Sequence, residues 1–524
     1  MPAAWTESAP PLEEPTPHSA PLLEVVGISK RFGAVQALDR VSIEFSAREV
    51  HAILGENGAG KTTLMRILAG EEIPDAGEIR LRGRVVRWRS PIEARRSGVA
   101  MVHQHFALAD SMTVAENLAL ALAHPGEWRL PGRTLAERVH EWQRSTGLEV
   151  PPLRSVVADL SVGARQRLEI LKALVGASQV LILDEPTAVL TPRETEQLFA
   201  LVRGLRDAGR VIVFISHKLA EVRELADRIT VLRQGRVVAR AQAPFGDLHQ
   251  LGEAMIGAPQ PEWVKPATPV GEELLRLDQA WSDAGAFEVG LRGVTVTVHA
   301  GEVFGIAGVD GNGQRELFEV LAGLRGLRRG ALYVQGRPVL ARHPADLLDA
   351  GVGLVPPDRR REGLILEMSV LENLLLHRRT LATLTRSCGV LNWHQARVHA
   401  QRLVEQFGIR AGGLDSPAAT LSGGNQQRVI LARELAAQPR ILVAVNPTRG
   451  LDFAATQFVH RTLAAAQAAG AAVLLISTDL EEILTLSDRV AVLYRGELSA
   501  PIEPPLDPLQ LGALMSGLDR AAAG

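Results

Sequence analysis

Short apolar runs rich in β-branched residues alternate with amphipathic stretches along most of the chain. The clearest runs are residues 50–54, 180–183 and 211–215. A short run that is mostly apolar, with no alternating polar face, is typical of a parallel strand covered by helices on both sides. The alternation of such strands with helical patterns therefore predicts an α/β fold assembled from βαβ units.

The same order of patterns occurs twice. Residues 49–55, Glu-Val-His-Ala-Ile-Leu-Gly, return as residues 302–308, Glu-Val-Phe-Gly-Ile-Ala-Gly, 253 positions later. The displacement has grown only to 261 where Leu160-Ser161 returns as Leu421-Ser422. Low-complexity sequence does not keep register over such a distance, so the repeat indicates a duplicated domain.

The repeat and the local composition together predict the domain limits. Residues 258–271 contain four prolines and little periodicity, as linkers do. We therefore place one domain at 21–257 and a second at 272–519. Residues 1–20 hold five prolines but no basic or apolar targeting region, so we expect a disordered tail rather than a signal peptide. Residues 520–524 form a short C-terminal tail.

Composition excludes several classes of protein. The formal net charge of −2 provides no basic field to recruit nucleic acid. Cys388 is the single cysteine, which excludes an internal disulfide framework or a cysteine-rich metal cluster. No run reaches the roughly 18 apolar residues that a bilayer span requires. These features indicate a globular protein without a membrane span of its own.

A phosphate-binding loop follows the first apolar strand. Residues 55–62 read Gly-Glu-Asn-Gly-Ala-Gly-Lys-Thr, a complete G-x-x-x-x-G-K-T pattern between a strand and a helical run. Backbone N–H groups of such loops surround phosphates, Lys61 would neutralise the β- and γ-phosphates of ATP, and the Thr62 hydroxyl would bind Mg²⁺. The expected nucleotide-binding residues are Gly55, Glu56, Asn57, Gly58, Ala59, Gly60, Lys61, Thr62 and Thr63.

Two adjacent carboxylates end the strand at 180–183. The carboxyl ends of parallel strands are where open sheets bind ligands. Asp184 is therefore a candidate ligand of Mg²⁺, and Glu185 a candidate to orient or deprotonate the attacking water. An acidic pair at a strand end is also a common solvated cap, but the phosphate loop upstream favours the catalytic interpretation.

Residues 421–428, Leu-Ser-Gly-Gly-Asn-Gln-Gln-Arg, resemble the LSGGQ signature of ABC ATPases. The resemblance implies two tandem P-loop domains, each with a RecA-like core and a helical subdomain. In this family the signature of one domain closes over the γ-phosphate of a nucleotide held by the other. Ser422, Gly423 and Gly424 would supply these contacts, and Asp452 occupies the acidic D-loop position.

Three residues of the first domain resemble further family positions. Gln104 matches the Q-loop glutamine, which senses the γ-phosphate and Mg²⁺ and leads into the segment that meets the membrane partner. His217, after the strand at 211–215, matches the switch histidine. Phe32 resembles the aromatic residue that stacks on adenine, although a buried core phenylalanine is an alternative.

The second domain lacks the equivalents of these groups. The repeat places Gln314 and Arg315 at the positions of Lys61 and Thr62, Pro357 at Gln104, Val445 and Asn446 at Asp184 and Glu185, and Thr478 at His217. The first domain's own signature has Val162 in place of a glycine, and Thr191 in place of the D-loop aspartate. Because each family site combines the phosphate loop of one domain with the signature of the other, all substitutions fall on one composite site. We therefore predict one hydrolytic site and one degenerate site, and leave open whether the second domain binds nucleotide.

The tandem arrangement is similar to that of the ATPases of bacterial ribose, galactose and nucleoside importers. Residues 355–364 resemble their VPEDR-x-x-x-GL element, while residues 101–106 and the missing acids at 445–446 resemble the nucleoside branch. The resemblance implies a peripheral protein on the cytoplasmic side of the cell membrane. Its partners would be two integral-membrane permease subunits and an extracytoplasmic solute-binding lipoprotein, with no nucleic acid.

Nucleosides are favoured over simple sugars as the transported solute, and this preference rests on analogy. The alternative classes are a soluble tandem ABC ATPase that acts on ribosomes or nucleic acid, and an inert regulatory module. The first usually keeps both sites active and carries a long charged linker, and the second conflicts with the complete catalytic set of the first domain.

Overall fold

The computed structural model divides into two compact units, residues 1–190 with 194–260, and residues 191–193 with 261–524. It describes residues 21–517 apart from 34, 104–106, 123–134, 136, 138, 141–149, 161, 175–177, 188–189, 191, 217, 246–247, 258–264, 285–287, 341–342 and 387–388. The exact limits of the two predicted domains stay a prediction.

A six-stranded sheet forms the centre of unit 1. Its order is β10 (Arg236–Gln242), β9 (Arg228–Arg233), β3 (Glu49–Leu54), β8 (Val211–Ile215), β7 (Val180–Asp184) and β6 (Val99–Val102). All neighbours pair in parallel except β10, which runs antiparallel to β9. The three strands predicted from apolar runs are confirmed.

Residues 180–183 of β7 and all of β8 are apolar because both faces of these strands are covered. Val180 and Ile182 of β7 belong to the core that includes helix α1 (Lys61–Leu68), whereas Leu181 and Leu183 pack with α5 (Val162–Leu174) and α6 (Pro192–Asp207). Successive strand residues point to opposite faces, so a buried parallel strand needs apolar residues at every position.

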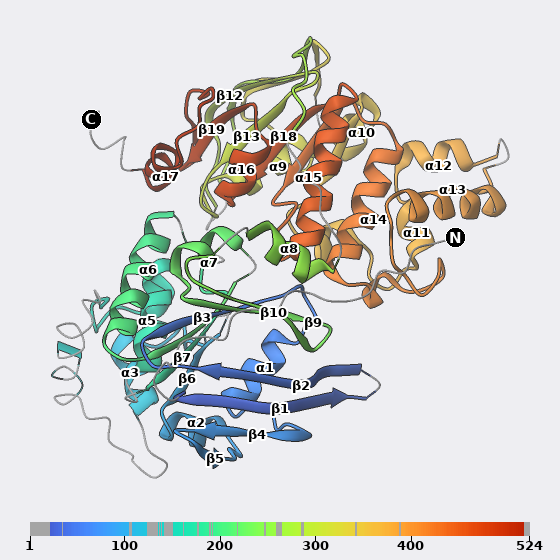
Figure 1. Ribbon diagram of the computed structural model, residues 1–524. Helices are drawn as coiled ribbons and strands as arrows, with labels where there is room; N and C mark the ends of the chain where they lie inside the picture. The colour runs from blue at the N-terminus through green and yellow to red at the C-terminus, as the bar shows by residue number, and fades with distance from the viewer. Residues whose placement is uncertain are drawn as a thin grey trace. The chain divides into compact units, whose positions relative to one another are not determined.

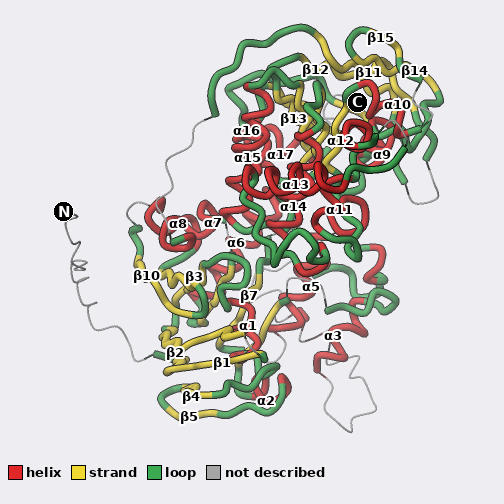
Figure 2. The backbone as a smooth tube through the Cα atoms, turned by 90° about the vertical axis from the view of Figure 1, so that its right-hand side faces the viewer, coloured by secondary structure: helices red, strands yellow, loops and turns green. Residues whose placement is uncertain are grey.

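Helix α1 lies between the central sheet and a smaller antiparallel sheet, with which it shares one core. The small sheet has the order β2 (Val35–Phe45), β1 (Leu23–Phe32), β4 (Ala76–Leu81) and β5 (Arg84–Val86), and Figure 2 shows its strands side by side. The remaining elements of unit 1 are α2 (Pro91–Arg96), α3 (Val114–Leu122), η1 (Val157–Asp159), α7 (Leu219–Leu225) and α8 (Leu248–Ile256).

Helices α3 and α5 form a separate helical part of unit 1. Their apolar side chains, among them Val114, Leu118, Leu168 and Leu171, form a core distinct from the two cores of the central sheet. The predicted division into a sheet-based core and a helical subdomain is therefore confirmed for this unit.

Unit 2 repeats this architecture. Its small sheet is β12 (Arg292–His299), β11 (Glu273–Trp281), β14 (Arg329–Val334) and β15 (Arg337–Pro338), and its large sheet is β16 (Val352–Val355), β17 (Ile441–Val445), β18 (Ala472–Ser477), β13 (Val303–Ala307), β19 (Arg489–Tyr494) and β20 (Glu497–Leu498). The helices are α9 (Gln314–Leu321), α10 (Pro344–Ala350), η2 (Arg359–Gly363), α11 (Val370–Leu375), α12 (Arg378–Leu384), α13 (Trp393–Gln406), η3 (Ala418–Thr420), α14 (Gly423–Ala436), α15 (Phe453–Ala468), α16 (Leu480–Leu486) and α17 (Pro508–Ser516).

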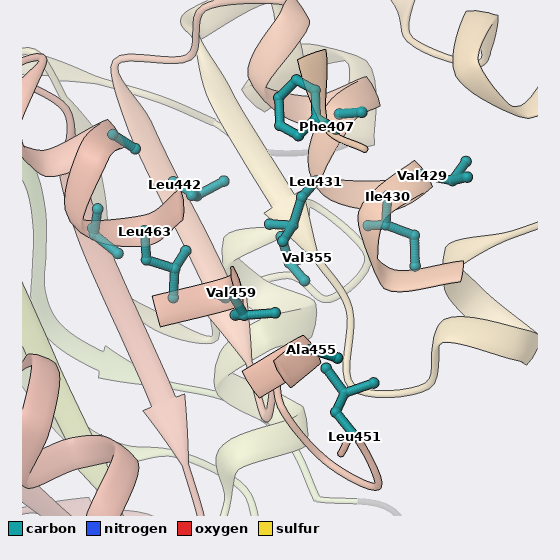
Figure 3. Close-up of a cluster of buried hydrophobic side chains, with 14 of the residues drawn as sticks. Val355, Phe407, Val429, Ile430, Leu431, Leu442, Leu451, Ala455, Val459 and Leu463 are labelled. Atoms are coloured by element: carbon teal, nitrogen blue, oxygen red, sulfur yellow. The ribbon is translucent and has the colours of Figure 1, made fainter. Parts of the chain in front are cut away.

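The helices α11–α14 of unit 2 lie to one side of its strands (Figure 1). A single core joins this helical part to the large sheet through residues such as Val355 at the end of β16, Ile430 in α14 and Val459 in α15 (Figure 3). Among the described residues of the whole chain, none of the helices is long and apolar enough to span a membrane.

Candidate nucleotide-binding site

The first element of the site is the loop that joins β3 to α1. Gly60 caps the N-terminus of α1 with φ of 103°. A Cβ atom at Gly60 would stand 2.5 Å from the Ala37 carbonyl oxygen, and one at Gly55 would stand 2.3 Å from the Leu232 carbonyl oxygen. Only glycine allows the loop backbone to come this close to β2 and β9, so both glycines fix the curved shape of the loop.

Lys61 lies inside this curve, with only 6% of its surface exposed. Its Nζ donates to the carbonyl oxygens of Gly55 at 2.6 Å and Glu56 at 3.0 Å. The N–H groups of the first turn of α1 point toward the same end of the helix, and Thr62 is exposed there. An ammonium group beside a helix N-terminus fits the phosphate groups of a nucleotide.

Asp184 ends β7 and is 6% exposed. Burial raises the pKa of its carboxyl group to about 6 and Glu185 adds to the shift, whereas the positive charges of Lys61 and His103 oppose it. A buried carboxylate in this situation is stabilised when a cation binds. Magnesium commonly takes one or two protein oxygens together with phosphates and water. The Asp184 carboxylate and the Thr62 hydroxyl therefore fit Mg²⁺.

Glu185 adopts a left-handed backbone conformation, with φ of 46°. Its N–H donates to the carbonyl oxygen of Ile215 at 3.0 Å, which ties the ends of β7 and β8 together. A left-handed residue other than glycine, asparagine or aspartate costs about 1–2 kcal/mol. This strain is accepted at the edge of the sheet where nucleotide chemistry is expected, as is common at functional sites.

Phe32, the last residue of β1, is 44% exposed, so the alternative of a buried core phenylalanine is wrong. The Lys30 ammonium lies 5.2 Å from the centre of its ring. An exposed aromatic face is available for stacking on a base, a geometry in which ring contact stabilises by about 0.5–1.5 kcal/mol. Its contact with adenine stays a prediction.

Gln104 and His217 lie outside the described residues, but a cluster beside His217 joins the ends of β7 and β8. The Glu221 carboxylate accepts hydrogen bonds from the hydroxyl groups of Thr187 and Ser216, both at 2.8 Å. In unit 2, Ser477 donates to Glu482 in the same way at 2.6 Å. Sequence reasoning missed this cluster, although the matching displacement of 261 between these Ser–Glu pairs was a usable signal.

In unit 2 the equivalent loop, between β13 and α9, is closed by Gln314. This side chain is 5% exposed. Its Nε2 donates to the Val309 carbonyl oxygen at 2.9 Å, and its Oε1 accepts from the Asn312 N–H at 3.0 Å. The bond from Nε2 to Val309 is equivalent to the bond from Lys61 to Glu56 in unit 1. The bond to Oε1, however, occupies a backbone N–H group of the kind that such loops direct at phosphate. Gln314 also contributes no positive charge.

The next two residues of this loop oppose phosphate binding as well. The Arg315 guanidinium pairs with the carboxylates of Glu319 and Glu362, each at 3.0 Å. Glu316, 5% exposed, stands at the position of Thr63 and accepts from the Val289 N–H at 3.3 Å. The Arg315 cation is therefore already paired, as is the Arg449 guanidinium, which lies 3.3 Å from the Asp310 carboxylate of the same loop. Glu316 adds a buried carboxylate next to Arg315 in the sequence.

Asn446 has the backbone conformation of Glu185 but not its chemistry. Its φ is 44°, and its N–H donates to the Ile476 carbonyl oxygen at 2.8 Å. Its Oδ1 accepts from the N–H of Thr478 at 2.8 Å and from the Thr478 hydroxyl at 3.2 Å. The residues at the positions of the general base and the switch histidine thus bind each other, and neither is an acid or base at neutral pH.

Unit 2 keeps the signature and the D-loop aspartate. Ser422 is exposed and caps α14, and its hydroxyl oxygen accepts from the Asn425 side-chain amide at 3.0 Å. Asp452 caps α15 by accepting from the Ala455 N–H at 2.9 Å. A Cβ at Gly424 would stand 3.0 Å from the Ala455 Cβ, so the two helix starts are adjacent. The pairing of this signature with the Lys61 loop stays a prediction.

Comparison with known proteins agrees with the tandem arrangement. The ABC transporter family model matches residues 38–188 and again 291–449. The chain belongs to the ABC transporter family. It is an ABC ATPase with two P-loop domains, as the duplication and the signature motif predicted.

Curated relatives match this ABC ATPase over nearly its full length. The nucleoside import ATP-binding protein NupA of Lactococcus lactis subsp. cremoris is 39% identical, covering 95% of this chain and 98% of the relative. The guanosine import ATP-binding protein NupO of Bacillus subtilis is 39% identical, covering 96% and 99%. The ribose import ATP-binding protein RbsA 1 of Rubrobacter xylanophilus is 40% identical, covering 96% and 99%.

Among solved structures, the RNase-L Inhibitor matches with a TM-score of 0.61, covering 95% of this chain and 92% of that chain. At 22% identity this match shows a shared tandem fold and carries no further implication for function.

Proposed function

We propose that this ABC ATPase is the ATP-hydrolysing subunit of a nucleoside importer, with a single hydrolytic site. The observation that carries the proposal is the contrast between the two loops. In unit 1 a buried lysine lies in the loop, whereas in unit 2 Gln314 closes the equivalent loop on itself. The relatives named for nucleoside and guanosine import support the choice of solute.

The residues of unit 1 divide the work of ATP hydrolysis. Lys61 and the first-turn N–H groups of α1 neutralise the phosphates. The Thr62 hydroxyl and the Asp184 carboxylate would hold Mg²⁺, and the bound ion would polarise the phosphates. Glu185, fixed by its backbone bond to β8, orients the attacking water and takes its proton, a role typically worth about 10²–10⁴-fold in rate.

Gln104 and His217 complete this set by family resemblance, as the groups that sense the γ-phosphate, and Phe32 stacks on the adenine. Ser422, Gly423, Gly424 and Asp452 close the site from the second domain. Binding of ATP then draws the two domains together, and hydrolysis releases them. This cycle of closing and opening drives transport.

The second domain binds no nucleotide phosphate in this proposal. Three properties of its loop support this: the N–H of Asn312 is already bonded, the Arg315 cation is already paired, and the next residue, Glu316, carries a buried carboxylate. A triphosphate would have to displace the Gln314 side chain from the Asn312 N–H and break the ion pairs of Arg315. It would also have to approach the negative charge of Glu316. One nucleotide per chain follows.

Two permease subunits and an extracytoplasmic solute-binding lipoprotein complete the importer, with this chain peripheral on the cytoplasmic side of the membrane. A simple-sugar importer is the second candidate, because the ribose import relative is as similar as the nucleoside import relatives. The solute contacts the permease and the lipoprotein, so the residues of this chain do not decide between them.

Transport into proteoliposomes tests the proposal. The chain is reconstituted with its permease subunits and lipoprotein, and ATP-dependent uptake of labelled guanosine, uridine and ribose is compared, with Lys61→Ala as the inactive control. Nucleoside uptake that Lys61→Ala abolishes supports the proposal. If only ribose is taken up, the proposed solute is wrong and the protein belongs to a simple-sugar importer. A chain that fractionates with ribosomes and not with membranes overturns the importer assignment.

A further inference from the structure

The turn η2 follows β16 in unit 2 and lies against the signature helix α14. Its last residue, Gly363, accepts a hydrogen bond from the Arg433 guanidinium at 2.8 Å, and a Cβ at Gly363 would stand 2.5 Å from the Ile430 side chain. Asp358 caps the start of the turn by accepting from the Arg360 N–H at 2.9 Å. These contacts fix the turn along the middle of α14.

Arg359, the first residue of η2, reaches from this turn to two other segments. Its NH1 donates to the carbonyl oxygen of Arg449 at 2.6 Å. Its NH2 lies 2.8 Å from the place where a Cβ of Gly423 would stand, and its central carbon 3.2 Å from the same place. The guanidinium therefore packs against the Gly423 backbone, and the absence of a side chain at Gly423 makes room for it.

Stability alone does not account for Arg359 at this position. Its Nε is buried without a hydrogen-bond partner, and the guanidinium forms no ion pair, among the residues that the structure describes. Burial lowers the pKa of this group. The neighbouring N-terminus of α14 carries partial positive charge, beside which a cation is unfavourable. Arg359 as a whole is half-buried, but a buried polar atom without a partner in a native structure calls for an explanation.

The two segments that Arg359 contacts are the ones expected to act on the nucleotide. Gly423 begins the signature helix, and Arg449 lies three residues before Asp452. Leu451 and Ala455 pack in the same core as Ile430 of α14 (Figure 3). The hydrophobic core thus connects α14 with the segment around Asp452 on their buried side. The Arg359 guanidinium connects the same two segments at the start of α14.

We propose that Arg359 is a positioning residue that holds the signature turn and the D-loop segment of the second domain in one fixed arrangement. The inference rests on the proposed function, because it assumes that these segments complete the site of the first domain. The repeat places Val162 at the position of Gly423, so the first domain's sequence has no glycine there.

Steady-state ATPase assays of the assembled transporter test the inference with three variants. Arg359→Ala is expected to lower kcat about tenfold while the KM for ATP changes less than about twofold, because a misplaced closing group weakens catalysis more than initial binding. Arg359→Lys keeps the charge and one donor but not the planar fork, so it recovers only part of kcat. Arg360→Ala, the exposed neighbour, is the matched control and keeps full activity.

Hydrogen exchange of the isolated full-length chain gives a readout that does not depend on turnover. Arg359→Ala should speed exchange of the amides at 423–427 and 450–456 severalfold, with the core of unit 1 unchanged. Arg359→Lys covers the case in which the alanine variant does not fold. Wild-type kcat together with unchanged exchange in Arg359→Ala would overturn the inference.

Failure of this inference is distinguishable from failure of the proposed function. Lys61→Ala is assayed in parallel. If Lys61→Ala is inactive while Arg359→Ala equals wild type, only the positioning role is wrong. If Lys61→Ala retains turnover, the proposed function itself is wrong.

Discussion

Glu185 and Asn446 show, at the scale of single residues, how the chain keeps a scaffold while losing a reaction. Both have left-handed backbones, with φ of 46° and 44°, and both donate their N–H to the neighbouring strand. Asparagine tolerates this conformation better than glutamate does. The strained acid is thus retained only where a base is expected.

Replacing Glu185 by asparagine tests this interpretation, because the variant copies the second domain. Glu185→Asn is expected to lower ATP turnover at least about 100-fold, the scale of a lost general base. Its thermal stability should be equal to or slightly above that of wild type, because backbone strain is relieved. The check is ATPase activity together with a calorimetric melting temperature. A variant that is both active and less stable contradicts the assignment.

Asp184 should make the ligand-free protein less stable as the pH rises. Its folded pKa of about 6 lies above the ordinary aspartate value of 3.8, so the folded state keeps a proton that the unfolded state has lost. Stability therefore decreases as the pH rises from about 4 to about 6, by roughly 3 kcal/mol in total, and stays low above that range. Denaturant unfolding of wild type and Asp184→Asn without Mg²⁺ measures the difference.

The asparagine variant should lack this decrease and be the more stable of the two at pH 7. Identical profiles for the two proteins between pH 4 and 7 would contradict the raised pKa of the buried Asp184 carboxyl group. An excess of Mg²⁺ with a non-hydrolysable ATP analogue should abolish the difference, because the bound cation stabilises the ionised form.

At the scale of elements, the two phosphate loops share one backbone design. Gly60 and Gly313 both cap their helices with positive φ, 103° and 111°, and both helices begin at the next residue. The loops differ in side chains: a lysine that leaves the loop positively charged, against a glutamine that bonds to both sides of the loop. The proposed difference in nucleotide binding between the loops thus starts from three consecutive residues, 314–316, on a common backbone.

A nucleotide count tests this comparison. Isothermal titration of the full chain with a non-hydrolysable ATP analogue and Mg²⁺ should give one site per chain, and none in Lys61→Ala. The triple variant Gln314→Lys, Arg315→Thr, Glu316→Thr rebuilds the first loop's sequence in the second and should add a second, weaker site. Two sites per chain in wild type would contradict the closed loop.

Sequence predicted the elements that depend on local pattern. The strands, the phosphate loop and the acidic pair were all readable from apolar runs and residue spacing, since the polypeptide carries that information in short segments. The bonds of Gln314 and Arg359 were not readable, because each joins positions whose proximity only the folded chain sets. For Phe32, sequence could not choose between core and surface, and its exposure decided the question.

At the scale of the whole molecule, the duplication gives one chain two similar units with unequal chemistry. A transporter with one competent site should respond to ATP hyperbolically, because cooperativity requires at least two coupled binding sites. The Hill coefficient of ATP hydrolysis by the assembled complex is therefore expected to be about 1. A coefficient well above about 1.5 would indicate that the second unit also binds ATP.

The central claim is that unit 1 alone carries hydrolysis, and a mirror pair of variants tests it most directly. Steady-state ATPase activity of the assembled transporter is measured for Lys61→Ala and Gln314→Ala, which truncate equivalent side chains in the two loops. The account predicts that Lys61→Ala is inactive and that Gln314→Ala keeps turnover within about twofold of wild type. Comparable losses in both variants, or an active Lys61→Ala, would contradict it.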